Sequence, residues 1–282
     1  MKEKDLAEKQ LEVYEDVYAD IVNVLLFQGD KELWEKELET ADSQSVYIGA
    51  SKLHGQERDV TKYWKNEAIR LAFIGVENQT TIDKSMPMRI LGYDGAAYRA
   101  QLLDKKQKAY YPVITLVLYF GYEKHWRRPL GLKECLQIPQ KLQPYVNDYR
   151  MNLFEIAYLP EEQVALFQSD FRIIADYFVQ MRKTRCYIPN KIPMVHTYET
   201  MQLLSMLTKD KRFAEVCKME QEGGMTMCEV LDRIEAKGFR RGEKLGRFAV
   251  LKELVEEGIL TVGEAARRVH MSEENFRKKC VK

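Results

Sequence analysis

The spacing of hydrophobic residues near the start of the chain predicts a helix over residues 6–27. Apolar side chains recur there at the 3.6-residue period of an amphipathic helix, and Gly29-Asp30 follows as a stop signal. The positions that form this stripe are Leu11, Tyr14, Tyr18, Ile21, Val22 and Leu25. A second, short amphipathic helix is expected over residues 31–38.

After residue 44 the pattern changes to one that favours strands. Residues 45–50 are predicted to form a short strand, and a polar stretch, 51–59, follows it. Residues 70–80 are apolar until they end in an acid and amides, a length that suits an internal strand better than a buried helix. Residues 83–107 return to helical spacing, with Met86, Ile90, Tyr93 and Ala97 on one face. Residues 111–121 are almost continuously apolar, which is typical of a strand covered on both faces.

This order of helix, strand, strand, helix and strand predicts an α/β core with a mixed sheet over residues 1–125. An α-rich extension is expected over residues 126–222, with helical segments at 160–182 and 193–222. The run Glu222-Gly223-Gly224 breaks the pattern, and residues 225–282 are expected to form a separate C-terminal helical module.

Composition narrows the class of protein. The chain has 282 residues, of which 45% are hydrophobic, and this is the composition of a globular protein. Its 44 basic and 43 acidic residues leave a net charge of +1, so any DNA-binding surface must come from local segregation of charge. Five dispersed cysteines without a CxxC pair, and four dispersed histidines, favour neither a zinc site nor a disulfide framework. The sequence shows no signal peptide and no apolar run of membrane-spanning length, so we expect a cytoplasmic protein without a membrane partner.

The residues with the clearest chemical meaning lie at the end of the strand predicted over 70–80. Side chains alternate along a strand, so Glu77 and Gln79 share a face, and Gly75 leaves room beside the acid. Asp59 stands at the start of the preceding strand, and adjacent strands could bring it close to Glu77. Two nearby carboxylates repel each other, and a bound Mg²⁺ (or Mn²⁺) relieves that repulsion.

The same three positions suit phosphodiester chemistry. The backbone carbonyl of Asn78 could add a third metal ligand to Asp59 and Glu77. The metal would polarise a phosphate oxygen and acidify a water for in-line attack, and Gln79 would orient that water.

At these residues the sequence resembles the recombination-promoting nuclease (Rpn) family, whose members include YhgA-like PD-(D/E)XK nuclease-family transposases. The resemblance covers about residues 17–185. It is carried by RDVTKYWK (58–65), GVENQT (75–80), MPMRILGYDGAAYRAQ (86–101) and PVITLVLYFG (112–121). It implies a restriction-endonuclease-like αβββαβ core and Mg²⁺-dependent DNA cleavage that promotes recombination. It also implies that Asp59, Glu77 and Gln79 occupy the motif positions, with Asp20 as a further acid of the same site.

One motif position departs from the PD-(D/E)XK pattern, because Gln79 stands where the pattern has lysine. Glutamine can hydrogen-bond a water but carries no positive charge. Three nearby cations could supply that charge instead: Lys62, Lys65 and Arg89.

The C-terminal module carries a second signal. Thr261 and Glu264 form a capping-box pattern, and Ser272 is placed to cap a further short helix that carries Phe276. An apolar stripe (Ala265, Ala266, Val269 and Met271) completes a pattern that resembles a helix-turn-helix. Five cations could contact phosphates: Arg267, Arg268, Arg277, Lys278 and Lys279. The alternative is a helical hairpin that packs on the rest of the chain or on a second copy, as in a homo-oligomer.

Three functions remain open at this point. The first is a divalent-metal-dependent DNA endonuclease linked to recombination or transposition. The second, motivated by Gln79, is a non-catalytic DNA-binding protein of the same fold. The third, motivated by the near-neutral net charge, is a protein-interaction module.

Overall fold

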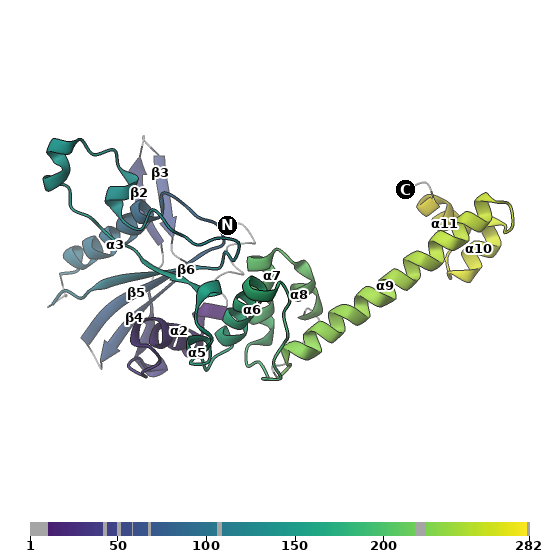
Figure 1. Ribbon diagram of the computed structural model, residues 1–282, viewed down its shortest axis with the longest axis horizontal. Coiled ribbons are helices and arrows are strands. Elements are labelled where there is room, and N and C mark those ends of the chain that lie inside the picture. Colours follow the sequence, from purple (N-terminus) through teal and green to yellow (C-terminus); the bar gives the residue numbers. More distant parts are fainter. Residues whose placement is uncertain are drawn as a thin grey trace. The chain divides into compact units, whose positions relative to one another are not determined.

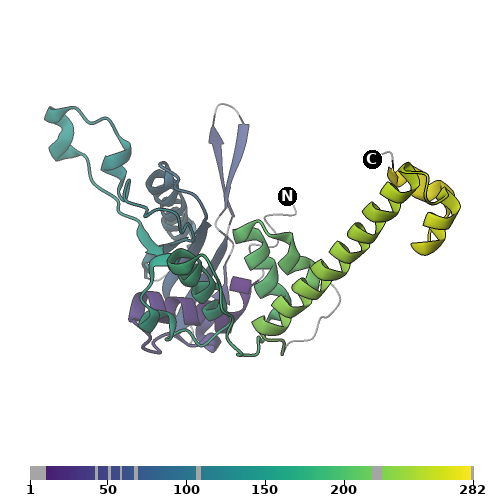
Figure 2. The same ribbon diagram turned by 45° about the vertical axis from the view of Figure 1, so that its right-hand side comes forward.

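The computed structural model describes residues 11–41, 44–49, 52–57, 59–66, 69–105, 109–217 and 224–280. The chain divides into two compact units, residues 1–227 and residues 228–282 (Figures 1 and 2). The segments predicted as the α/β core and the α-rich extension both lie in the first unit.

The first unit is built on a mixed five-stranded sheet, so the predicted α/β class is confirmed. The strands are β1 (Leu38–Thr40), β4 (Val60–Asn66), β5 (Ile69–Gln79), β6 (Val113–Tyr119) and β7 (Asn152–Glu155), and they lie side by side in that order. The β1/β4 and β4/β5 pairs are antiparallel, whereas β5/β6 and β6/β7 are parallel. The hairpin of β2 (Gln44–Gly49) and β3 (Lys52–Glu57) forms a separate two-stranded sheet.

The first predicted helix is confirmed over α2 (Glu15–Phe27), and a 3-10 turn, η1 (Leu11–Val13), precedes it. The Tyr18 hydroxyl of α2 donates a hydrogen bond to the carbonyl of Ile74 at 2.7 Å, which anchors the helix to one face of β5. Residues 6–10 of the prediction lie outside the described residues.

The prediction of a helix over residues 31–38 is wrong. The chain forms only a 3-10 turn there, η2 (Glu35–Glu37), and then enters β1. Pairing of β1 with β4 outweighs the local helical pattern, because the strand gains hydrogen bonds along the sheet that an isolated short helix would lack.

Strands β5 and β6 lie inside the sheet, as their apolar runs predict. Helix α3 (Met86–Leu103) crosses between these parallel strands, and its Met86, Ile90 and Tyr93 pack with Val117 and Tyr119 of β6. On the other face, Phe120 packs edge-on or tilted against Phe171 and Phe178 of α6 (Phe171–Thr184), and α2 covers the same side (Figure 1). The sheet is therefore covered on both faces.

The rest of the first unit is mostly helical. The helix expected over residues 160–182 is divided into α5 (Glu161–Val164) and α6. The other elements are α4 (Leu132–Cys135), η3 (Gln140–Tyr145), η4 (Ile156–Tyr158), α7 (Thr197–Thr208) and α8 (Lys211–Cys217). Across the described parts of both units, no helix is long and apolar enough to cross a membrane.

The second unit consists of helices α9 (Met227–Glu256), α10 (Val262–Arg268) and α11 (Glu273–Cys280), with α9 beginning at the last residue of the first unit. The predicted capping box is confirmed. The Glu264 amide donates to Thr261 Oγ1 at 3.3 Å, and the Thr261 amide donates to Glu264 Oε2 at 2.9 Å. The core of this unit is small and consists of Leu251, Ala265, Ala266 and Phe276.

Candidate functional site at the end of strand β5

Asp59 and Glu77 lie next to each other where β4 begins and β5 ends. Val60 pairs with Val76, so the same antiparallel register, continued by one residue, sets Asp59 opposite Glu77. The Asn78 amide donates a hydrogen bond of 2.6 Å to Asp59 Oδ2, which holds that carboxylate at the strand end. Residues directly opposite each other point to the same face of a sheet, and here that is the face covered by α3.

Glu77 is buried, with 3% of its surface exposed, and its surroundings are polar. Arg89 of α3 forms an ion pair with Glu77 Oε1, and Gln79 Nε2 donates to the same oxygen at 3.3 Å. Arg89 also donates to Asp83 Oδ2 and to the Tyr93 hydroxyl, each at 3.0 Å. This carboxylate is therefore the buried centre of a hydrogen-bonded network.

The electrostatics of this network link Tyr93 to both acids. Burial, then the charge of Glu77, raise the pKa of the Tyr93 hydroxyl, and the charge of Asp59 adds to the rise. Burial acts to lower the pKa of Arg89, but Glu77, Tyr93 and Asp83 outweigh it and raise that pKa above its ordinary value. The site thus combines two carboxylates with a guanidinium that stays charged.

Of the three cations that the sequence offers in place of the motif lysine, Arg89 is the one that contacts Glu77. Lys62 pairs with Ile74, whose side chain is on the face opposite to Glu77, and its Nζ lies 3.1 Å from Glu15 of α2. Lys65 forms an ion pair with Glu39 of β1. Strand alternation and sheet pairing direct both lysines away from the Glu77 side chain.

The structure adds one acid that the sequence pattern does not mark. Glu12 of η1 is fully buried, and its Oε2 accepts a hydrogen bond of 2.8 Å from Asn78 Nδ2. Asn78 thus contacts Asp59 through its backbone and Glu12 through its side chain. A helical pattern cannot single out Glu12, because its place depends on the change from a 3-10 turn to α2.

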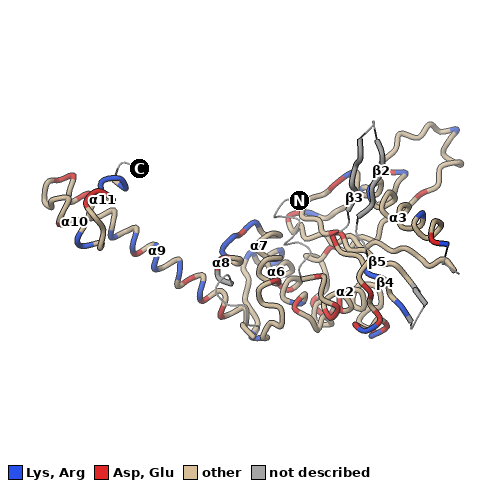
Figure 3. The backbone as a smooth tube through the Cα atoms, turned by 180° about the vertical axis from the view of Figure 1, so that it is seen from behind, with Lys and Arg blue, Asp and Glu red and all other residues tan. Residues whose placement is uncertain are grey.

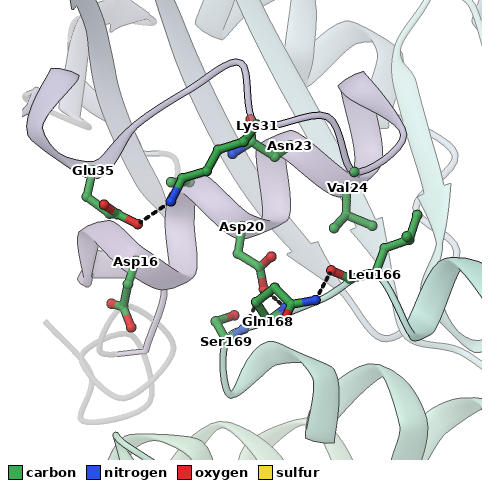
Figure 4. A pocket seen from close by; sticks show the side chains of 11 residues that line it. Asp16, Asp20, Asn23, Val24, Lys31, Glu35, Leu166, Gln168 and Ser169 are labelled. Carbon is green, nitrogen blue, oxygen red and sulfur yellow. Dashed lines mark hydrogen bonds and ion pairs between the residues drawn. The ribbon is translucent and has the colours of Figure 1, made fainter.

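Asp20, the further acid that the resemblance implies, has a structural role. It lies on α2, and its Oδ2 accepts hydrogen bonds from the amides of Gln168 and Ser169 at 2.9 and 2.7 Å. It lines a small pocket of about 180 Å³ together with Asp16, Lys31 and Glu35 (Figure 4). Asp20 thus joins α2 to the segment before α6, on the face of the sheet opposite to Glu77.

The oxygen donors at the end of β5 are of the kind that hard cations take. They are the carboxylates of Asp59 and Glu77 and the carbonyl of Asn78, which points to the same neighbouring strand as the amide that binds Asp59. Within the described residues, no group of three or more His, Cys, Asp or Glu side chains is placed to hold a metal ion. A cation here would therefore need water for most of its remaining coordination positions.

A family model described as "Putative transposase, YhgA-like" matches residues 60–186. Residues 60–186 are therefore similar to the YhgA-like transposase family. This YhgA-like domain contains Glu77, Asn78, Gln79 and Arg89, and it begins one residue after Asp59. This similarity points to a function related to transposition. No curated protein and no solved structure matches the chain.

Proposed function

We propose that this protein is a divalent-metal-dependent DNA endonuclease that hydrolyses phosphodiester bonds in recombination or transposition. The observation that carries the proposal is the placement of Asp59 opposite Glu77 at the end of β5, inside or beside the YhgA-like domain. Apart from the separate β2–β3 hairpin, the order is helix α2, antiparallel strands β1, β4 and β5, helix α3 and parallel strand β6. This order supports the proposal, because it matches the αβββαβ order that the nuclease resemblance implies.

Asp59 and Glu77 would hold the Mg²⁺ or Mn²⁺, with the Asn78 carbonyl as a third ligand. When bound, such an ion supplies a Lewis acid for a phosphate oxygen and lowers the pKa of a coordinated water. The donor set fits in kind, since two carboxylates on one face repel each other until a cation lies between them.

Arg89 and Gln79 supply the functions that lysine has in the common motif. The Arg89 guanidinium lies at Glu77 and is one-third exposed, so it can reach a phosphate at the mouth of the site. Gln79 shares the same carboxylate oxygen and can orient a water through its amide. Arg89 also neutralises Glu77 when no metal is present, which keeps the buried carboxylate compatible with folding.

A non-catalytic DNA-binding protein of the same fold is the second candidate. It is favoured by the ion pair itself, because a guanidinium on Glu77 competes with a metal for that carboxylate. Gln79 also favours a non-catalytic protein, since it lacks the positive charge that lysine has at this position of the motif.

Nicking of supercoiled plasmid separates these candidates. The full chain with Mg²⁺ or Mn²⁺ is expected to convert the plasmid to open-circular and linear forms, and EDTA is expected to stop the reaction. Salt-dependent DNA binding without cleavage in either metal would support the non-catalytic protein instead. A chain that neither cleaves nor binds DNA would support a protein-interaction module.

Gln79→Ala is expected to slow plasmid nicking by about 10²-fold, the scale of losing a group that positions a reacting water. It should disturb metal affinity less than Asp59→Ala, because a neutral amide contributes less to holding a cation than a carboxylate. Gln79→Lys is expected to lower cleavage too, since Arg89 already occupies Glu77 Oε1 and a second cation would crowd it.

The double variant Gln79→Lys/Arg89→Ala is the matched test of this crowding. It should cleave faster than Arg89→Ala alone, because the new lysine restores one positive charge in the space that the guanidinium leaves. Nicking that is indifferent to both single changes at position 79 would place this residue outside the active centre.

A further inference from the structure

The second unit carries a groove whose charged side chains are all basic. It has a volume of about 610 Å³ and lies between α9 and the turn that joins α10 to α11. Lys244 and Arg247 come from α9, Arg268 from the end of α10, and Lys279 from α11. The apolar part of the lining consists of Leu245, Phe248, Val269 and Met271. His270 is the remaining lining residue.

The turn that shapes this groove is held in a specific backbone conformation. His270 has a φ of 53°, in the left-handed region that non-glycine residues rarely adopt. The Met271 amide donates to the carbonyl of Ala266 at 2.9 Å, which closes the end of α10. This closure turns the chain back so that α11 brings Lys279 to the same groove as Arg268.

The structure divides four of the five cations that the sequence marks for phosphate contact into two pairs. Arg268 and Lys279 line the groove. Arg267 and Lys278 are held by their own helices, since Arg267 Nε donates to the Gly263 carbonyl at 3.3 Å and Lys278 Nζ donates to Glu274 at 2.6 Å. In both α10 and α11, a cation that lines the groove is therefore next in sequence to a cation that is held elsewhere.

The basic lining continues along α9 beyond the groove. At about 100° per residue, five exposed cations fall within an arc of about 120° on this helix. They are Lys237, Arg240, Arg241, Lys244 and Arg247. Glu243 is the one acid in this segment and falls outside the arc. Figure 3 shows Lys and Arg recurring along α9 and gathered in α11.

We infer that this groove and the basic arc of α9 bind the phosphodiester backbone of double-stranded DNA, as a second contact separate from the Asp59–Glu77 site. Cations from three helices and a row along α9 suit a polyanion better than a single phosphate, because successive phosphates repeat along a strand. The apolar lining can pack against sugars and base edges. The choice of DNA over RNA as the ligand rests on the proposed nuclease function. The arrangement of the cations, which points to a polyanion, does not depend on that function.

The test compares two double variants of the full chain that carry the same change in composition and net charge. Arg268→Ala/Lys279→Ala removes the groove cations, and Arg267→Ala/Lys278→Ala removes their neighbours. Binding to a fluorescein-labelled 20-base-pair duplex is followed by anisotropy in EDTA over a series of NaCl concentrations. The groove variant should bind at least about 10-fold more weakly at low salt, and its log–log salt slope should fall by about 2. The neighbour variant should change both by less than half as much.

Equal losses of DNA affinity in the two variants, or no loss in either, would overturn the proposal that the groove binds DNA. Tighter binding of an RNA duplex of the same sequence would overturn the assignment to DNA. Thermal unfolding followed by circular dichroism should be the same for both variants, because all four side chains are exposed. If the wild type fails to cut DNA, and only the groove variant loses DNA affinity, the groove is supported and the nuclease function is rejected. If the wild type cuts DNA, and the groove variant binds DNA as tightly as the wild type, the nuclease function is supported and the groove is rejected.

Discussion

Asp59→Asn and Glu77→Gln are each expected to lower metal-dependent plasmid nicking by at least about 10³-fold, to the background of the assay. Each change replaces a carboxylate that would hold the metal by a neutral amide of nearly the same shape. The metal is the source of both the polarised phosphate and the activated water in this chemistry, so the loss of one ligand removes both effects together. Initial rates at saturating Mg²⁺ and Mn²⁺ measure the change.

The two variants should differ in stability, and this difference tests the geometry independently of cleavage. Asp59 accepts a hydrogen bond from the Asn78 amide, which the Oδ1 of an asparagine could also accept. Glu77 is 3% exposed and paired with Arg89, so Glu77→Gln, which removes the charge of that pair, should lower the free energy of unfolding by about 2 kcal/mol. That value lies below the range for breaking a fully buried pair, because Arg89 reaches solvent. Urea unfolding gives the comparison.

Asp20→Asn is the matched control for these substitutions. It removes the same charge from the same unit, but Asp20 binds the amides of Gln168 and Ser169 on the other face of the sheet. It is expected to nick plasmid at close to the wild-type rate. Wild-type nicking by Asp59→Asn or Glu77→Gln would show that these acids do not form the catalytic centre.

Arg89→Ala is expected to change two measurable properties in opposite directions. Cleavage should fall by up to about 10³-fold, because the guanidinium is the cation beside Glu77 that can stabilise charge on a phosphate. Affinity for Mn²⁺, measured by titration calorimetry, should rise, because the ion pair that competes for Glu77 has been removed. A structural role alone would lower both quantities.

Arg89→Lys and Arg99→Ala complete this test. Lysine keeps the charge but cannot reach Glu77, Asp83 and Tyr93 together as the planar guanidinium does, so cleavage should be restored only in part. Arg99 is an exposed arginine of the same helix, and its loss should leave both cleavage and metal affinity unchanged. An Arg89→Ala variant that cleaves like wild type would assign the charge of the missing motif lysine to another residue.

The strands and the helix that frame the site follow from local pattern. The apolar run over residues 70–80 and the richer one over residues 111–121 become β5 and β6, because strands buried on both faces need apolar residues at every position. The stripe of Met86, Ile90 and Tyr93 becomes the buried face of α3. The capping box at Thr261 formed as expected, since it involves residues only three apart. Local pattern was insufficient over residues 31–38, where pairing with β4 replaced the expected helix by β1.

The sequence by itself determined the α/β class, the strand that carries Glu77 near its end, and the resemblance to YhgA-like transposases that residues 60–186 bear out. Only the tertiary structure decided which charges meet. Register set Asp59 opposite Glu77, strand alternation turned Lys62 to the other face, and the α3 crossover brought Arg89 to the acid. The same holds in the tail, where packing of three helices directs Arg268 and Lys279 to one groove. Periodicity reports the face on which a residue lies within its own element, but contacts between elements depend on register and packing over long separations in the chain.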